Sequence, residues 1–302
     1  MWNLSPMNAK NNVNGIGAIH RNEVYTLKHK DLLAVHEAVT RKIVAELRDA
    51  DNLYYEICNE PYFGGVTLEW QHRIADAIVE AEKDFPHKHL IAQNIANGKA
   101  KIEKPHPAVS IFNFHYATPP DTVAMNWGLS KPLADDETGF KGSADAVYRG
   151  EGWDFMIAGG AIYSNLDYSF TPDTEYGTAK PDAPGGGGRT LRIQLATLKG
   201  FIESFDFVKM APDNSVIKGG VPPKATARAL VEKGKAYAVY IRGGGQANLT
   251  LDLPPGTWKA EWIHTQLGTI QNPATFQHPG GEKALLSPLY VVDIALRVTA
   301  AP

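Results

Sequence analysis

The segment "YYEICNEPYF", residues 54–63, decides how the rest of the chain is interpreted. Its aromatic and apolar residues predict a buried strand over 53–58, and Asn59, Glu60 and Pro61 follow where that strand ends. An unpaired carboxylate is costly in such a place. Glu60 is therefore either a structural residue in a salt bridge or a group that the fold holds there for chemistry.

Helices and strands alternate from Asp31 onward. Apolar residues at helical spacing predict helices over 31–49, 68–85, 143–156 and 191–205, with Asp31 and Thr67 opening the first two. Strand-like runs lie between them at 89–94, 109–117, 132–138 and 159–170. Strands separated by crossover-length segments indicate a parallel sheet with helices outside it. We therefore expect five parallel strands in an α/β fold.

The pattern changes after about Pro212. Short runs of alternating apolar and polar residues follow at 235–242, 247–253, 257–264 and 290–298, and the breaks between them are "RGGGQ", "LPPGT" and "NPATFQHPGG". This spacing is typical of an antiparallel β-sandwich. We therefore expect two domains, 1–212 and 213–302, and interpret "KPDAPGGGG" (180–188) as a long loop of the first.

Composition excludes several classes of partner. The chain has 30 basic and 33 acidic residues, a net charge of −3 and no run of Lys or Arg, so no nucleic acid or membrane partner is expected. The N-terminus shows no export signal, which predicts a cytoplasmic protein if the chain is full-length. Cys58 is the single cysteine, and no His, Asp or Glu cluster has metal-ligand spacing, so we expect no metal and no cofactor.

Two glutamates stand at predicted strand ends, 77 residues apart: Glu60 and Glu137. In a parallel α/β barrel the carboxyl ends of the strands converge on one face, so these side chains can face each other. Glycoside hydrolysis needs such a pair, one acid to protonate the leaving oxygen and one carboxylate across the anomeric carbon. The alternative is two structural carboxylates, and Asp135 and Asp136 compete for the second role.

Asn59-Glu60-Pro61 after an aromatic strand resembles the acid/base signature of clan A retaining glycosidases, which are (β/α)8 barrels. In that clan the acid/base follows an Asn at the end of strand 4, and the nucleophilic Glu ends strand 7. The resemblance implies that Glu60 is the acid/base, that Glu137 is the nucleophile and that Asn59 binds the sugar 2-hydroxyl. It also implies that His115 and Tyr116 match the strand-6 imidazole and aromatic residue that contact the nucleophile.

Further sugar contacts are expected on aromatic and amide side chains. Where the clan has a Trp on strand 8 beneath the sugar, this chain offers Tyr163, Asn165 and Tyr168. Trp127 and Trp153 are candidate stacking platforms, with packing as the alternative. Segment 220–300 resembles the small C-terminal β-sandwich, labelled collagen-binding, that follows such barrels in some bacterial members.

The resemblance covers only part of the family barrel. Too few residues precede the Asn-Glu-Pro strand for strands 1–3, so we expect an incomplete (β/α) TIM-type barrel holding strands 4–8. Its open side predicts a homo-oligomer, a dimer or higher.

The implied function is a retaining β-glycosidase, leaning exo-acting on β-galactosides, β-fucosides or β-glucosides. The alternatives are an endo-acting cellulase or mannanase and a non-catalytic carbohydrate- or matrix-binding barrel remnant.

Overall fold

The computed structural model describes residues 2–180 and 186–301, so most of the expected loop at 180–188 lies outside the described residues. The chain divides into two compact units. The first runs to His115 and takes in Gly128–Ala134, and the second takes in Tyr116–Trp127 and the chain from Asp135 on. The expected domain boundary near residue 212 separates the α/β part of the chain from the antiparallel β part. It stays a prediction.

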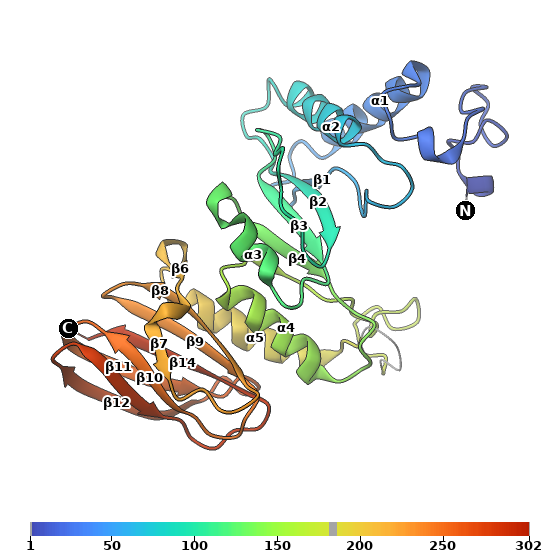
Figure 1. Cartoon of the computed structure of the whole chain (residues 1–302). Helices are drawn as coiled ribbons and strands as arrows, with labels where there is room; N and C mark the ends of the chain where they lie inside the picture. The colour runs from blue at the N-terminus through green and yellow to red at the C-terminus, as the bar shows by residue number, and fades with distance from the viewer. Residues whose placement is uncertain (1, 181–185, 302) are drawn as a thin grey trace. The chain divides into compact units, whose positions relative to one another are not determined.

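The first unit combines α-helices with parallel strands (Figure 1). Helices α1 (Lys30–Glu46) and α2 (Leu68–Ala81) accompany β1 (Tyr55–Glu56), β2 (Ile91–Asn97) and β3 (Ile111–His115), with short 3-10 helices at Trp2–Leu4 and Arg21–Glu23. β2 pairs in parallel with both β1 and β3, and its register shifts between Asn94 and Ala96. The unit is filled by buried apolar side chains that include Trp70, Ile78 and Phe112.

The predicted helix starts have different outcomes. Thr67 is the N-cap of α2, since its hydroxyl oxygen accepts the Trp70 N–H at 3.2 Å, as predicted. Asp31 is not the N-cap of α1, because the helix begins one residue earlier with His29 at the cap position. The Asp31 carboxylate instead accepts the Leu32 N–H at 2.9 Å within the first turn, where a negative charge favours the helix dipole.

The five predicted strands form one sheet in chain order, with β4 (Leu133–Glu137) and β5 (Ile162–Tyr163) following β3. In the first unit the Phe112 N–H donates to the Pro132 carbonyl at the start of β4, and in the second the Ser164 N–H donates to the Asp135 carbonyl. Neighbouring backbone thus holds β4 just before its first residue and at its middle residue. This order is the one expected for part of an α/β barrel.

The second unit carries two antiparallel sheets. The six-stranded sheet has the order β12-β11-β14-β9-β8-β6 and the three-stranded one β13-β10-β7. Their bounds are β6 (Ala211–Pro212), β7 (Ile217–Gly219), β8 (Thr226–Glu232), β9 (Ala236–Arg242), β10 (Asn248–Leu253), β11 (Gly256–Ile263), β12 (Ile270–His278), β13 (Gly281–Leu286) and β14 (Asp293–Ala300). Apolar side chains of both sheets, such as Leu251 and Val239, share one core. The finer assignment as a collagen-binding β-sandwich stays a prediction.

Helices of the second unit cover the other face of the six-stranded sheet. Helices α4 (Asp145–Ile157) and α5 (Arg189–Glu203) lie beside β9 in Figure 1. Trp153, Leu198 and Phe201 from these helices pack with Tyr240 of β9 in a second apolar cluster. The unit also contains α3 (Asp121–Asn126) and short 3-10 helices at Phe207–Lys209 and Asn214–Val216, while the 3-10 helix Trp127–Leu129 lies where the chain passes to the first unit.

One predicted break is in fact a strand. "NPATFQHPGG" (272–281) was expected to separate strands, but β12 runs through most of it and pairs with β11. β12 is an edge strand whose residues are mostly exposed. An edge strand tolerates proline and polar residues because one of its sides needs no ladder hydrogen bonds, and this is why the pattern resembled a turn.

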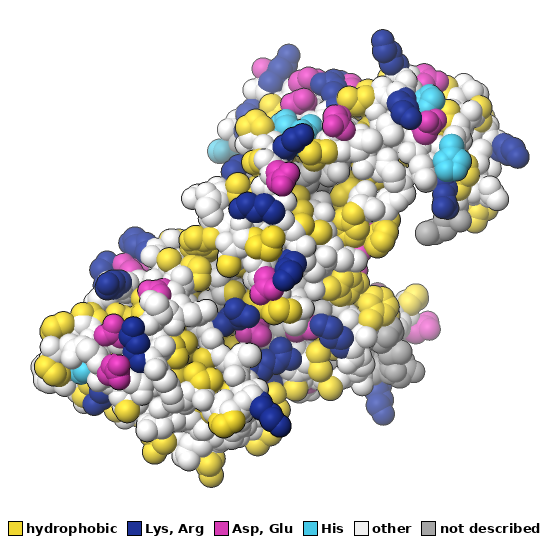
Figure 2. All heavy atoms as spheres, in the orientation of Figure 1, with side chains coloured by type: hydrophobic (Ala, Val, Ile, Leu, Met, Phe, Trp, Pro, Cys, Tyr) yellow, Lys and Arg dark blue, Asp and Glu magenta, His cyan; other side chains and the backbone are white. Residues whose placement is uncertain are grey.

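The surface is mixed in charge. On the face shown in Figure 2, acidic and basic side chains are interspersed with hydrophobic ones. Within the described residues, none of the helices has the length and apolar character needed to cross a membrane.

Candidate active site

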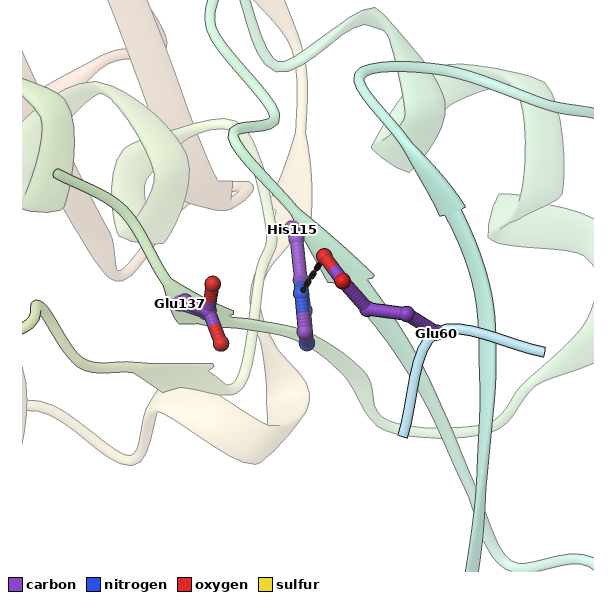
Figure 3. A group of neighbouring side chains, drawn as sticks. All are labelled: Glu60, His115 and Glu137. Atoms are coloured by element: carbon purple, nitrogen blue, oxygen red, sulfur yellow. Dashed lines mark hydrogen bonds and ion pairs between the residues drawn. The ribbon is translucent and has the colours of Figure 1, made fainter. Parts of the chain in front are cut away.

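Glu60 lies four residues beyond the end of β1, in a left-handed backbone conformation with φ of 47°. Such a conformation is uncommon for a residue with a Cβ atom. The Glu60 N–H donates to the Asn94 side-chain oxygen on β2, at 3.2 Å. Its carboxylate oxygen Oε1 lies 3.2 Å from His115 Nδ1 at the end of β3, and Figure 3 shows this hydrogen bond. The Glu60 side chain is 26% exposed and that of His115 2%, so the carboxylate reaches solvent while the imidazole is buried.

Tyr62 is a second neighbour of the Glu60 carboxylate. Its hydroxyl lies 3.3 Å from Glu60 Oε1 and 2.5 Å from Asn97 Oδ1. A phenol has one proton to donate, so these two oxygens share one donor. Phe63 packs edge-on against the Tyr62 ring and is 60% exposed. The sequence pattern did not single out Tyr62, Phe63 or Asn97, because the first two lie in the loop after the signature and Asn97 comes from another strand.

Glu137 is the last residue of β4 and is half-buried. Its Oε1 accepts the Tyr116 hydroxyl at 2.6 Å, and its backbone carbonyl accepts the Tyr116 N–H at 2.8 Å. Tyr116 has a positive φ of 55°, which marks a sharp change of direction where β3 ends. The family resemblance implies that both His115 and Tyr116 contact the nucleophile. Tyr116 bonds Glu137, whereas the hydrogen bond of His115 described above goes to Glu60.

The residues after Glu137 are anchored to helix α4. The Thr138 hydroxyl donates to the buried carboxylate of Glu151 at 2.7 Å, and Lys141 also binds this carboxylate. Phe140, in the same loop, is 59% exposed, and its ring lies 6.2 Å from that of Tyr116. The sequence did not single out Phe140, because an isolated Phe carries no pattern.

The two competing aspartates differ from Glu137 in exposure. Asp135 is fully buried, and its Oδ1 accepts the Ala117 N–H at 3.3 Å. Strand alternation puts Asp135 on the same face as Glu137, but a buried carboxylate held by backbone is poorly placed to attack a substrate. Asp136 is half-buried, and strand alternation puts it on the opposite face of the sheet from Asp135 and Glu137.

Three of the predicted sugar contacts have other partners. The Tyr163 hydroxyl donates to the Tyr148 carbonyl of α4 at 2.8 Å, and burial raises the pKa of Tyr163 well above its usual range. Trp127 packs beside Gly159, which precedes β5 and so lies at the amino end of that strand, away from the carboxyl ends. Trp153 is fully buried and stacks on Tyr240. Trp153 therefore serves the packing of the second unit, which contradicts its predicted sugar contact. The sugar contacts of Trp127, which is 41% exposed, and of Tyr163 stay predictions.

The two asparagines predicted to bind sugar, Asn59 and Asn165, are at least partly exposed to solvent. Asn59 is exposed, and its carbonyl accepts the Cys58 thiol at 3.5 Å. Asn165 is half-buried, and its amide donates to the Leu166 carbonyl at 3.0 Å. Their contacts with a sugar stay predictions. Burial, with a smaller contribution from Glu56, raises the pKa of Cys58 to about 11, so it is a protonated thiol at neutral pH.

Glu60, His115 and Glu137 each offer a ligand atom that a divalent metal could use. The hydrogen bond between Glu60 and His115 and that between Tyr116 and Glu137 already engage an atom of each. The expectation that the chain binds no metal stays a prediction.

Comparison with known proteins identifies the fold. No protein-family model matches the chain, and no curated protein does. Among solved structures, one described as a glycoside hydrolase matches with 17% identity and a TM-score of 0.66, over 89% of this chain and 69% of that one. A glycoside hydrolase family 5 protein from Bacteroides vulgatus matches with 16% identity and a TM-score of 0.65, over 90% and 68%. This chain shares its fold with glycoside hydrolases.

Proposed function

We propose that this protein is a retaining β-glycosidase in which Glu137 is the nucleophile and Glu60 is the general acid and base. The fold shared with glycoside hydrolases supports the reaction class. Two glutamates that follow or end strands of one sheet, each with a hydrogen-bonding partner, support the assignment of roles.

One observation carries the proposal. His115 is bonded to Glu60, and the very next residue, Tyr116, is bonded to Glu137. Consecutive Cα atoms are about 3.8 Å apart, so the residues that bond the two glutamates, His115 and Tyr116, are necessarily neighbours. Two structural carboxylates would have no need of adjacent partners at the end of one strand.

The chemistry follows from these contacts. Glu137 attacks the anomeric carbon while Glu60 gives its proton to the glycosidic oxygen, which leaves as an alcohol. Glu60, now a carboxylate, takes a proton from water, and the water oxygen displaces Glu137 with net retention. A retaining pair needs carboxyl groups about 5–5.5 Å apart, and we expect that separation with substrate bound. The Tyr116 hydroxyl fixes the orientation of the attacking carboxylate.

The substrate is proposed to be β-linked. The exposed rings of Phe63 and Phe140 offer stacking surfaces near the partners of the two glutamates. The expectation of exo action on β-galactosides, β-fucosides or β-glucosides has no support from the similar structures and stays a prediction. Analysis of products from oligosaccharides distinguishes release of terminal sugars from internal cleavage by a cellulase or mannanase.

The experiment is a panel of nitrophenyl β-glycosides with the wild type, Glu60→Gln and Glu137→Gln. Asp136→Asn is the matched control, because it removes the neighbouring carboxylate of the same strand. We expect kcat to fall by at least about 10³-fold in Glu137→Gln and to change little in Asp136→Asn. A wild-type chain that binds sugars but hydrolyses none of the panel would favour the binding-protein alternative.

A further inference from the structure

Asn94 is a buried amide with one bond to the candidate acid. It is 1% exposed on β2, at the point where the register of that strand shifts. Its Oδ1 accepts the backbone N–H of Glu60 at 3.2 Å. Its Nδ2 is buried and has no hydrogen-bond partner among the described residues.

This arrangement is costly for a strand. A buried amide nitrogen without a partner loses its hydrogen bonds to water and gains none in return. An apolar side chain of the same size would carry no such penalty. Glu60 adds a second cost, since its φ of 47° is disfavoured for a residue with a Cβ atom. The two unfavourable features are connected, because the hydrogen bond from the Glu60 N–H to Asn94 Oδ1 holds the strained backbone of Glu60 against the neighbouring strand.

We infer that Asn94 is a positioning residue for Glu60 in its role as general acid. This inference rests on the proposed function. Asn94 fixes the backbone of Glu60. The Glu60 carboxylate then lies within hydrogen-bonding distance of His115 Nδ1 and the Tyr62 hydroxyl, in position to protonate the leaving oxygen. Without that bond, Glu60 relaxes toward an ordinary backbone conformation and its carboxyl group moves away from the glycosidic oxygen.

The chain supplies a matched control in Asn113. It is the residue opposite Asn94 on β3, it is also 1% exposed, and its Oδ1 also lacks a partner among the described residues. Its amide donates to the Glu56 carboxylate at 2.8 Å instead. Replacing it disturbs the same buried layer and leaves the bond between Asn94 and Glu60 in place.

The test compares two leaving groups in Asn94→Leu, Asn94→Ala and Asn113→Leu, using the sugar that the wild type cleaves best. A dinitrophenol leaves without a proton, whereas a methoxyphenol needs one. General acid catalysis contributes about 10²–10⁴-fold. We therefore expect kcat/KM for the methoxyphenyl glycoside to fall by at least about tenfold in both Asn94 variants and that for the dinitrophenyl glycoside to stay within about threefold.

The outcomes separate the two claims. Equal losses with both leaving groups, no loss in a folded Asn94 variant, or the same split in Asn113→Leu would each overturn the positioning role alone. Thermal unfolding of each variant shows whether it is folded. A wild-type chain that hydrolyses neither glycoside would overturn the proposed function, and the positioning role with it.

Discussion

The two candidate catalytic glutamates have different sets of side-chain partners. Glu60 has a buried imidazole and a phenol beside it, and Glu137 has the Tyr116 phenol. A residue that must give and take a proton gains from an imidazole neighbour, while a nucleophile gains from a hydrogen-bond donor that orients its carboxylate. The partners therefore agree with the proposed division of roles.

The role of Glu60 predicts the behaviour of its alanine variant. Glu60→Ala removes the base that activates water, so the glycosyl-enzyme persists and turnover of an activated glycoside slows. Azide is a nucleophile that needs no base, and we expect it to raise turnover and to form a β-glycosyl azide, identified by NMR. An unchanged rate with azide, or an α-azide product, would contradict this role.

His89 gives a pH-dependent contribution to stability. Its Nδ1 lies 2.6 Å from Glu82 Oε1, both side chains are nearly buried, and the hydrogen bond to Glu82 raises the pKa of His89. A raised folded pKa means that the contribution is complete below the unfolded value of about 6.5 and is lost as pH rises through the folded pKa. We expect the unfolding free energy to fall with pH above about 6.5 through this pair. Chemical denaturation at several pH values measures this pH dependence of the unfolding free energy, with His89→Gln as the control. The same slope in both proteins would contradict this assignment.

At the scale of elements, helix α4 is tied to the six-stranded sheet by a buried ion pair. Arg149 donates two hydrogen bonds to the Asp293 carboxylate, at 3.0 and 3.1 Å, and both side chains are almost fully buried. Gln194, Tyr240 and Thr265 complete the network. This network fixes the helix that also anchors Thr138, the residue after Glu137.

Breaking this pair should be strongly destabilising. Arg149→Met leaves the Asp293 charge buried without its partner, so we expect a loss of about 3–5 kcal/mol in unfolding free energy. Arg149→Met with Asp293→Leu should recover most of that loss, because no isolated charge remains. Urea denaturation measures both. The exposed pair of Lys199 and Glu203 is the control, with an effect of about 0.5 kcal/mol for Lys199→Ala. An Arg149→Met effect no larger than the control would contradict the prediction.

Periodicity predicted the four long helices and the five strands in their correct order. It did not predict the bounds of β1, where only Tyr55 and Glu56 are in the ladder, because an apolar run does not show where pairing stops. It also missed α3, which has six residues and too few turns to show a period. Edge strand β12 was missed because its proline and exposed polar residues resemble a turn.

The candidate site was predictable in part. A motif and a strand-end register locate Glu60 and Glu137, since both are local features of the sequence. The partners of Glu60 come from residues 34 and 55 positions away, and such contacts depend on which strands pair and on the register shift in β2. Aromatic side chains are the least predictable, because a buried packing residue such as Trp153 has the same residue type as a sugar platform.

At the scale of the whole molecule, oligomerisation stays a prediction. The five-stranded sheet has β1 and β5 as its outer strands, whereas an α/β barrel of this type closes with eight. We therefore expect a homodimer or higher assembly of this chain that covers the open edges, and activity that falls on dilution below its dissociation constant. Sedimentation velocity at assay concentrations measures the assembly. A monomer with full activity would contradict this expectation.

The most direct test of the two-glutamate mechanism is to trap its covalent intermediate. A 2-deoxy-2-fluoro glycoside with a dinitrophenol leaving group forms the glycosyl-enzyme quickly and releases it slowly, so the nucleophile stays labelled. After proteolysis, mass spectrometry should find the fluorosugar on the peptide that contains Glu137, and on Glu137 within it. A label on Asp135, Asp136 or Glu60, or an active enzyme that acquires no label, would contradict the mechanism.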